Sequence, residues 1–389
     1  MYFDKYYAIP SLLWFAPHFH GYILEPLQLF TAFKTADTLQ YLLCLWGIAL
    51  SLLLLIGRPR ILMNSGSYFI LWLLYLSHFK GGDRFMGFQW DLLLLEAGFA
   101  TIFFAPFWHT KLYEVTPCDS VAREILRFLG FRLLFASGIV KLLSKCKAWW
   151  SLSAMHYHFE TQPLPHFLSW YAHQMTPDIV KRYMVVATFV FEILAPPLFY
   201  SPFREHRIFS SLANILLMAS VIVTGNYNFF NILTSTVLLV ILDDKFIFHY
   251  TPKWLLKALD IQVPMEQIVE EMKHVYGEGW CCTKFILKVR KGLSYAILAG
   301  IFALSAKLFP YDLVKEGKLP FTYEEFRAVT HNRKLMLGMA VYGVNVVFIS
   351  QVTECIRWVN RNHERLCAVL THAVSYFFLL IFGYGLAIA

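Results

Sequence analysis

The chain has 389 residues, of which 58% are hydrophobic, 17% aromatic and only 15% charged, and its mean hydropathy is +0.51. Soluble globular proteins carry about 25% charged residues, so this composition excludes an ordinary soluble domain. The net charge of +8 does not indicate nucleic-acid binding, because Lys and Arg stand in short loops beside apolar segments, where they report membrane orientation. We expect a membrane protein whose constant partner is the lipid bilayer, and no cofactor.

The start of the chain lacks the basic, apolar and small-residue regions of a signal peptide, so no cleaved signal is expected. Seven cysteines show no CxxC spacing, which argues against a disulfide framework and against a zinc ribbon. The sequence also contains no N-x-S/T glycosylation sequon.

Ten apolar stretches approach or reach the roughly 20 residues that a membrane-crossing helix needs. They are 37–57, 61–79, 88–108, 123–143, 183–201, 207–224, 229–243, 293–309, 335–352 and 366–388. The seventh is short. The predicted fold is therefore all-α: a polytopic transmembrane helix bundle of about nine to ten spans.

Composition divides the chain into four regions. Residues 1–36 are predicted to form an interfacial segment, 37–243 a core helix bundle, 244–292 a cytosolic polar and amphipathic segment, and 293–389 the C-terminal transmembrane helices. The positive-inside rule places one sizeable loop, 144–182, in the lumen.

Several polar residues fall inside the predicted spans, where they are costly and normally face the bundle interior. In the third span, Gln89 and Glu96 stand seven residues apart and so share one helix face. Asp91 is predicted at the helix start, where a negative charge suits the helix dipole.

The fourth and fifth spans add three more such groups. Arg132 is the predicted partner of Glu96, and Lys141 is expected to extend toward the lumenal interface. Glu192 precedes Pro196 by one turn, and a proline there disrupts the helix. Such groups either fix how helices dock, at about 0.6 kcal/mol each, or mark a substrate path; the sequence favours docking.

The string TGNYNFFN, residues 224–231, places Asn226, Asn228 and Asn231 among aromatic residues between two spans. Asparagine tolerates left-handed backbone and mimics turns. The string therefore predicts a tight turn between helices, and its asparagines complete the predicted buried polar network.

The predicted lumenal loop contains MHYHFETQPLP, residues 155–165. His156, His158, Glu160, His166 and His173 are of the right kind for zinc, but their spacing matches no known zinc pattern. An acid–base pair of His158 and Glu160 is a second interpretation, and it lacks a nucleophile with an orienting base. The favoured role is loop architecture or recognition, with His158 and Glu160 holding the loop's shape by hydrogen bonds.

Aromatic residues flank this string on both sides, which describes either a loop on the membrane surface or a binding surface for another protein. Partner binding is the favoured interpretation. The predicted partner-binding or signature residues are Trp149, Trp150, Tyr157, His158, Glu160, Gln162, Pro163 and Trp170.

Four strings together resemble the lipase maturation factor family from about residue 10 to about residue 245. They are FQWDLLLLEAGF, FRLLFASGIVKLLSKCKAWWSLSAMHYHFETQPLP, TGNYNFFNILT and LLVILDD. The resemblance implies a multi-pass protein of the endoplasmic reticulum membrane that assists the folding and assembly of secreted homodimeric lipases. It implies a chaperone-like factor without catalysis of its own.

Relative to that family, the chain is expected to be a truncated or divergent member, lacking the first transmembrane helix and the C-terminal soluble domain. Two alternatives stay open. The first is an intramembrane enzyme acting on a lipid-like substrate through Glu96, Arg132, Glu192 and His158, which requires these side chains to converge. The second, a transporter, would favour inverted repeats, and the sequence shows no internal symmetry.

Overall fold

The computed structural model describes residues 35–56, 62–82, 86–106, 117–162, 166–252, 254 and 281–330. Within these ranges all regular structure is helical, and no strand is present. Residues 1–34 of the predicted interfacial segment and the last two predicted spans lie outside the described residues.

The described chain forms two compact units, and the first contains residues 1–126. Its helices are α4 (Thr35–Ile56), α5 (Ser65–Gly81) and α6 (Gln89–Phe104), which match the first three predicted spans. Side chains join α5 to α6: the Tyr75 hydroxyl donates to Asp91 Oδ1 at 2.5 Å, and the Trp72 ring N–H donates to the Leu95 carbonyl at 3.0 Å.

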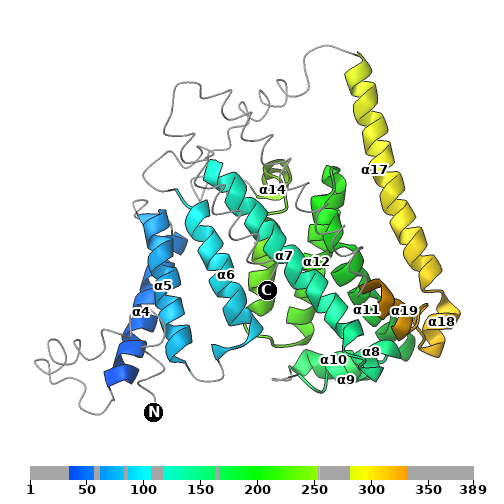
Figure 1. Ribbon diagram of the computed structural model, residues 1–389, viewed down its shortest axis with the longest axis horizontal. Coiled ribbons are helices and arrows are strands. Elements are labelled where there is room, and N and C mark those ends of the chain that lie inside the picture. The colour runs from blue at the N-terminus through cyan, green and yellow to red at the C-terminus, as the bar shows by residue number, and fades with distance from the viewer. Residues whose placement is uncertain are drawn as a thin grey trace, which may run out of the picture. The chain divides into compact units, whose positions relative to one another are not determined.

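The second unit contains residues 127–348, and α7 leads into it from the first. Figure 1 labels most of its helices. They are α7 (Pro117–Leu143), α8 (Lys147–Trp150), α9 (Ala154–His158), α10 (Phe167–Met175), α11 (Asp178–Phe189), the π-turn η5 (Val190–Leu194), the 3₁₀ turn η6 (Pro196–Tyr200), α12 (Arg204–Thr224), α13 (Phe230–Leu239), α14 (Asp244–Tyr250), α17 (Cys281–Leu308), α18 (Tyr311–Glu316) and α19 (Tyr323–Thr330).

Three helical stretches are long and apolar enough to cross a membrane: Asp178–Tyr200, Arg204–Thr224 and Lys291–Leu308. Two shorter apolar helices, Gln40–Ile56 and Phe230–Leu239, accompany them. The second of these is the predicted seventh span, which is short in the structure too. The chain is an all-α membrane protein, as its composition predicts.

The predicted proline disruption is present in the first of these three stretches. The α-helix ends at Phe189, the Ala195 N–H bonds to the Val190 carbonyl as in a π-turn, and a 3₁₀ turn begins at Pro196. Gly138 of α7 lies against this turn, and a Cβ atom there would come within 2.5 Å of Ile193 Cγ1. The absence of a side chain at Gly138 therefore lets the two backbones approach closely.

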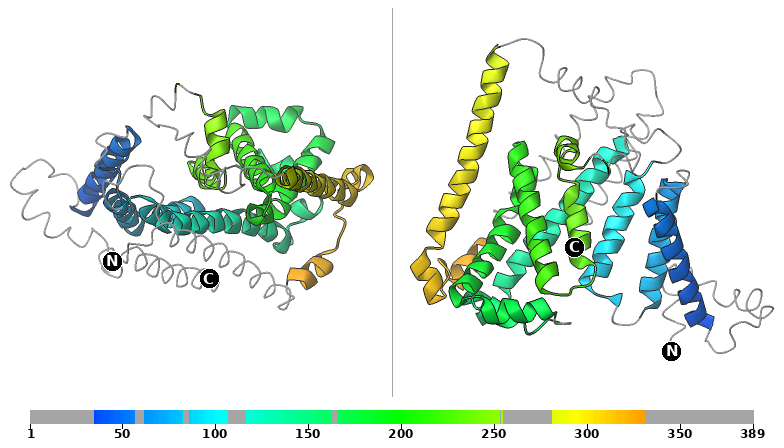
Figure 2. Two further views of the ribbon diagram at one scale, coloured as in Figure 1. Left: turned by 90° about the horizontal axis from the view of Figure 1, so that it is seen from above. Right: turned by 180° about the vertical axis from the view of Figure 1, so that it is seen from behind.

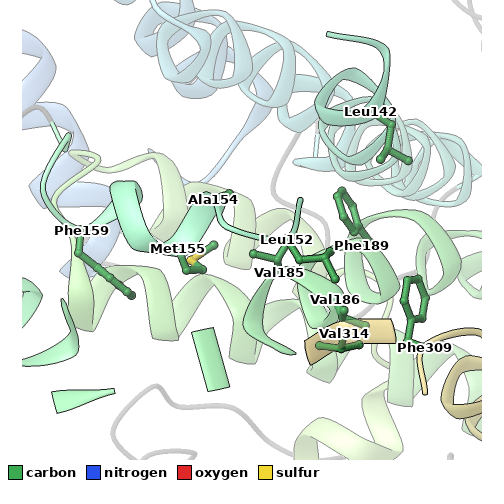
Figure 3. Close-up of a cluster of buried hydrophobic side chains, with 10 residues drawn as sticks. All are labelled: Leu142, Leu152, Ala154, Met155, Phe159, Val185, Val186, Phe189, Phe309 and Val314. Atoms are coloured by element: carbon green, nitrogen blue, oxygen red, sulfur yellow. The ribbon is translucent and has the colours of Figure 1, made fainter. Parts of the chain in front are cut away.

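At one end of the second unit, helices from distant parts of the chain share a core. Leu152 and Met155 of the loop pack with Val185 and Phe189 of α11 and with Val314 of α18 (Figure 3). This cluster holds α8, α9, α11 and α18 together, so the loop after α7 is a packed part of the fold.

Residues 309–330 cover this loop further. The Trp150 ring meets Phe321, Tyr323 and Phe326 at centroid distances of 5.9, 5.8 and 6.5 Å, and its ring N–H donates to the Leu142 carbonyl at 3.0 Å. Residues 309–330 and the loop after α7 therefore form one packed region.

The other end of the spans has its own polar contacts. Arg204 at the start of α12 pairs with Asp243, the N-cap of α14. The buried His206 ring bonds through Nδ1 to the Ser201 hydroxyl and through Nε2 to the Ser294 carbonyl, both at 2.9 Å. Ser201 Oγ also accepts the Phe203 N–H, so this Ser–His pair fixes the turn before α12.

Candidate functional site: the motif junction

Two of the strings found in the sequence meet at the end of α12. We call this meeting point the motif junction. It consists of His158, Gln162, Ser169, Thr224, Gly225 and Tyr227. Figures 1 and 2 show α8, α9 and α10 gathered at that end of the second unit.

The carbonyl of Thr224, the last residue of α12, receives two side-chain donors from the loop. Gln162 Nε2 donates to it at 3.0 Å and Ser169 Oγ at 2.6 Å. The last carbonyls of a helix have no partner inside the helix and need one from outside. The loop therefore caps α12, and the two strings depend on each other locally.

Gly225 permits this close contact. A Cβ atom at position 225 would lie 2.5 Å from Gln162 Oε1 and 3.0 Å from its Cδ, and both residues are buried. Any larger residue would displace the Gln162 side chain that caps α12. The glycine is thus required by space, since its backbone is extended.

A stacked pair of rings forms the other half of the junction. The His158 and Tyr227 rings lie 6.1 Å apart with only 11° between their planes. Burial lowers the pKa of His158 below its ordinary value, and the positive charge of Lys141 lowers it further. Burial also raises the pKa of Tyr227, so both rings are neutral near pH 7.

The lowered pKa of His158 predicts a loss of stability in mild acid. Between the lowered folded pKa and the ordinary value of about 6.5, the unfolded chain binds more protons than the folded one. The free energy of unfolding therefore falls as pH falls through that window. We expect thermal unfolding in detergent to show this fall as the pH drops below about 6.5, and His158→Phe, which keeps the stacked ring, to reduce it. An identical pH dependence in both chains would contradict the assignment.

Two other histidines of the loop, His156 and His173, lie beside carboxylates. His173 Nε2 lies 2.8 Å from Glu160 Oε1, and His156 Nε2 lies 3.2 Å from Asp178 Oδ1. Glu160 therefore contacts His173. The acid–base interpretation required Glu160 to contact His158 instead. Among the residues described, no three His, Cys, Asp or Glu side chains come together as metal ligands.

An ion pair lies beside the junction. Lys141 Nζ is 2.5 Å from Glu192 Oε2 and also donates to the Ser137 carbonyl at 3.1 Å. The Trp149 ring lies 5.4 Å from the same ammonium group. Both partners were predicted as buried polar residues, but Lys141 was expected to extend away from the bundle; it turns inward to neutralise Glu192 instead.

Other predicted polar residues separate into buried and exposed groups. Asp91 and Asn231 are buried, whereas Gln89, Asn226 and Asn228 are exposed, so the structure does not place these three in a buried network. Their exposure follows from position: Gln89 begins its helix, and the two asparagines form a turn.

That turn confirms the interpretation of TGNYNFFN. The Asn228 N–H donates to Asn226 Oδ1 at 3.2 Å, and Asn228 has a φ of 53°.

The predicted ion pair between Glu96 and Arg132 is not tested by the structure. Glu96 and Arg132 belong to different units, so their pairing stays a prediction.

The aromatic residues predicted to bind a partner also differ in their exposure. Trp149 and Trp150 are half-buried and pack inward, so replacing either by alanine would disturb the fold. Tyr157 and Trp170 are 58% and 60% exposed. Pro163 lies outside the described residues.

The apolar helices and the motif junction together define an all-α membrane protein with a packed loop domain at one end of its spans. Comparison with known families identifies the family within this class: residues 2–250 match the lipase maturation factor transmembrane domain. The chain belongs to the lipase maturation factor family.

Curated relatives agree with this family. Lipase maturation factor 2 of Xenopus laevis is 44% identical over 242 residues, 61% of this chain and 32% of the relative. The Gallus gallus protein of that name is 36% identical over 359 residues, 89% of this chain and 45% of the relative. Lipase maturation factor 1 of Mus musculus is 30% identical over 301 residues, 75% of this chain and 51% of the relative.

The chain thus spans between about a third and a half of the length of these relatives. A match covering 89% of the chain extends past residue 310, well beyond the stretch that ends near residue 245 in the four strings. The packing of residues 309–330 on the loop is consistent with that longer similarity. No solved structure matches the chain.

Proposed function

We propose that this chain is a non-enzymatic, chaperone-like maturation factor of the endoplasmic reticulum membrane. Its clients are secreted homodimeric lipases, and the loop of residues 144–182 faces them in the lumen. The family and the names of its relatives support a role in lipase maturation.

The observation that carries this proposal is the motif junction. The contacts between its two strings are structural: they cap a helix, stack two neutral rings and fix the loop on the ends of the spans. A loop held this firmly presents its outer residues in one arrangement, which reduces the entropy lost when a partner binds.

The non-enzymatic part of the proposal is supported by how the acid–base candidates are used. Glu192 is paired with Lys141, and Glu160 Oε1 lies 2.8 Å from His173 Nε2. Each carboxylate that the sequence offered for acid–base chemistry at this end of the second unit therefore has a structural partner.

Tyr157 is the residue best placed to touch a client, because it is exposed on α9 next to the junction. We expect the chain to co-precipitate a secreted homodimeric lipase and to increase the active lipase secreted from cells. Tyr157→Ala is expected to lower both severalfold. Leu216→Ala is the control, since Leu216 is similarly exposed, at 66%, but lies within the membrane-crossing helix α12.

Two results would contradict the proposal. If the unchanged chain neither captures lipase nor raises its secretion, the function is wrong. If Tyr157→Ala and Leu216→Ala behave alike, the loop surface around Tyr157 is not where the client binds.

A further inference from the structure

Helix α10 has an apolar face that the protein does not cover. Phe167, Trp170, Tyr171 and Met175 are 67%, 60%, 49% and 74% exposed. They stand at positions i, i+3, i+4 and i+8, which lie on one side of an α-helix. No described segment packs on this side.

The opposite side of α10 is fixed to the fold. Ser169 is buried, donates to the Thr224 carbonyl and closes a capping box with His166 at the helix start. His173, one turn later, pairs with Glu160. The helix therefore has one polar side attached to the motif junction and one aromatic side directed away from it.

The point of attachment gives the depth of α10. Thr224 is the last residue of a helix long and apolar enough to cross a membrane, so α10 lies at the level where that span ends. Figures 1 and 2 show α10 running across the ends of the spans, not parallel to them.

The surface of α12 is apolar and exposed up to the residue to which α10 is attached, Thr224. Ile222 and Val223 are 42% and 54% exposed, immediately before Thr224. Ser169 of α10 bonds to Thr224 directly after these two residues, so α10 lies where this exposed apolar stretch of α12 ends.

We propose that α10 lies in the plane of the membrane surface, with Phe167, Trp170, Tyr171 and Met175 inserted at the boundary between lipid headgroups and acyl chains. Trp and Tyr collect at this boundary because one part of each ring system is apolar and the other polar. Amphipathic helices buried in this way hold their apolar face several Å below the headgroups. The role assigned to α10 is to anchor the motif junction to the membrane surface, and it does not rest on the proposed function.

The test uses the full chain in phosphatidylcholine vesicles in which some acyl chains carry bromine near the headgroup and others near the bilayer centre, and bromine quenches tryptophan fluorescence on contact. The signal of Trp170 is the difference between the unchanged chain and Trp170→Phe, a conservative change that keeps an aromatic side chain. Trp46→Phe is a positive control, because Trp46 is 70% exposed on an apolar helix. Trp150→Phe is a negative control, because Trp150 is packed among aromatic rings.

We expect brominated lipid to quench most of the Trp170 difference signal, as for Trp46, and aqueous iodide to leave it nearly unchanged. The opposite result, with strong quenching by iodide and none by brominated lipid, would overturn the proposal. It would leave the face open to water and available to a protein partner. Because neither measurement includes a lipase, failure here is distinct from failure of the proposed function.

Discussion

Replacing Gly225 by alanine is expected to cost the folded chain about 1–3 kcal/mol, the range for leaving a buried hydrogen-bonding group without its partner. The new Cβ would lie 2.5 Å from Gln162 Oε1, so the Gln162 side chain must leave the position from which it caps Thr224. The free energy of unfolding of the purified chain in detergent measures this loss.

A double-mutant cycle with Gln162→Ala separates this cause from a general effect on the turn. The three atoms nearest to the new Cβ all belong to Gln162, so removing that side chain relieves the closest contacts. The two changes should therefore be non-additive by about 0.5–3 kcal/mol, as for residues in contact. Gly300→Ala is the matched control, since a Cβ there meets no atom within 4 Å. Strict additivity would contradict the proposed contact.

Breaking the Lys141–Glu192 pair is expected to have the largest effect of all. Lys141→Met leaves the Glu192 carboxylate buried without its 2.5 Å partner, and removing one member of a buried pair costs about 3–5 kcal/mol. Thermal unfolding in detergent should show the Lys141→Met chain melting well below the unchanged one.

Replacing both members is expected to restore most of that loss, because apolar residues of similar size often substitute for a buried ion pair at little cost. We therefore expect Lys141→Met with Glu192→Leu to be more stable than Lys141→Met alone. The exposed pair of Lys318 and Glu316 is the control, and Lys318→Met should leave stability unchanged. A double variant as unstable as the single one would mean that the pair is not the cause.

The membrane helices could be predicted from the sequence because span length and hydrophobicity are local properties. The disruption before Pro196 could be predicted for the same reason, since proline acts on its own helix. The turn at Asn226 and Asn228 is also local. Each of these follows from residues within a few positions of one another.

The motif junction could not be predicted in this way, because its contacts join residues far apart in the chain. Gln162 and Thr224 both stood in recognised strings, yet neither string shows that an amide in one caps a helix in the other. Gly225 was the one residue in the sequence that could have indicated this contact, since a glycine directly after a helix leaves room for another side chain.

The pairing of Lys141 with Glu192 was missed for a different reason. The fifth span was predicted to begin at residue 183, whereas its helix begins at Asp178 and its first turns pack on α9. Glu192 therefore lies further from the start of its helix than a helix beginning at residue 183 would place it. Trp150 was assigned to recognition because the residues 321–326 that pack against it lie far along the chain.

Glycosylation mapping tests the central claim, that the loop carrying the motif junction faces the lumen. The native sequence has no N-x-S/T sequon, so any glycan must come from an inserted tag. A tag with a flexible spacer in the exposed turn at residues 144–146 should be glycosylated in cells. A matching tag at Pro202, in the turn before α12 at the other end of the spans, should not. Glycosylation at Pro202 and none at the 144–146 turn would place the loop in the cytosol and contradict both the topology and the proposed function.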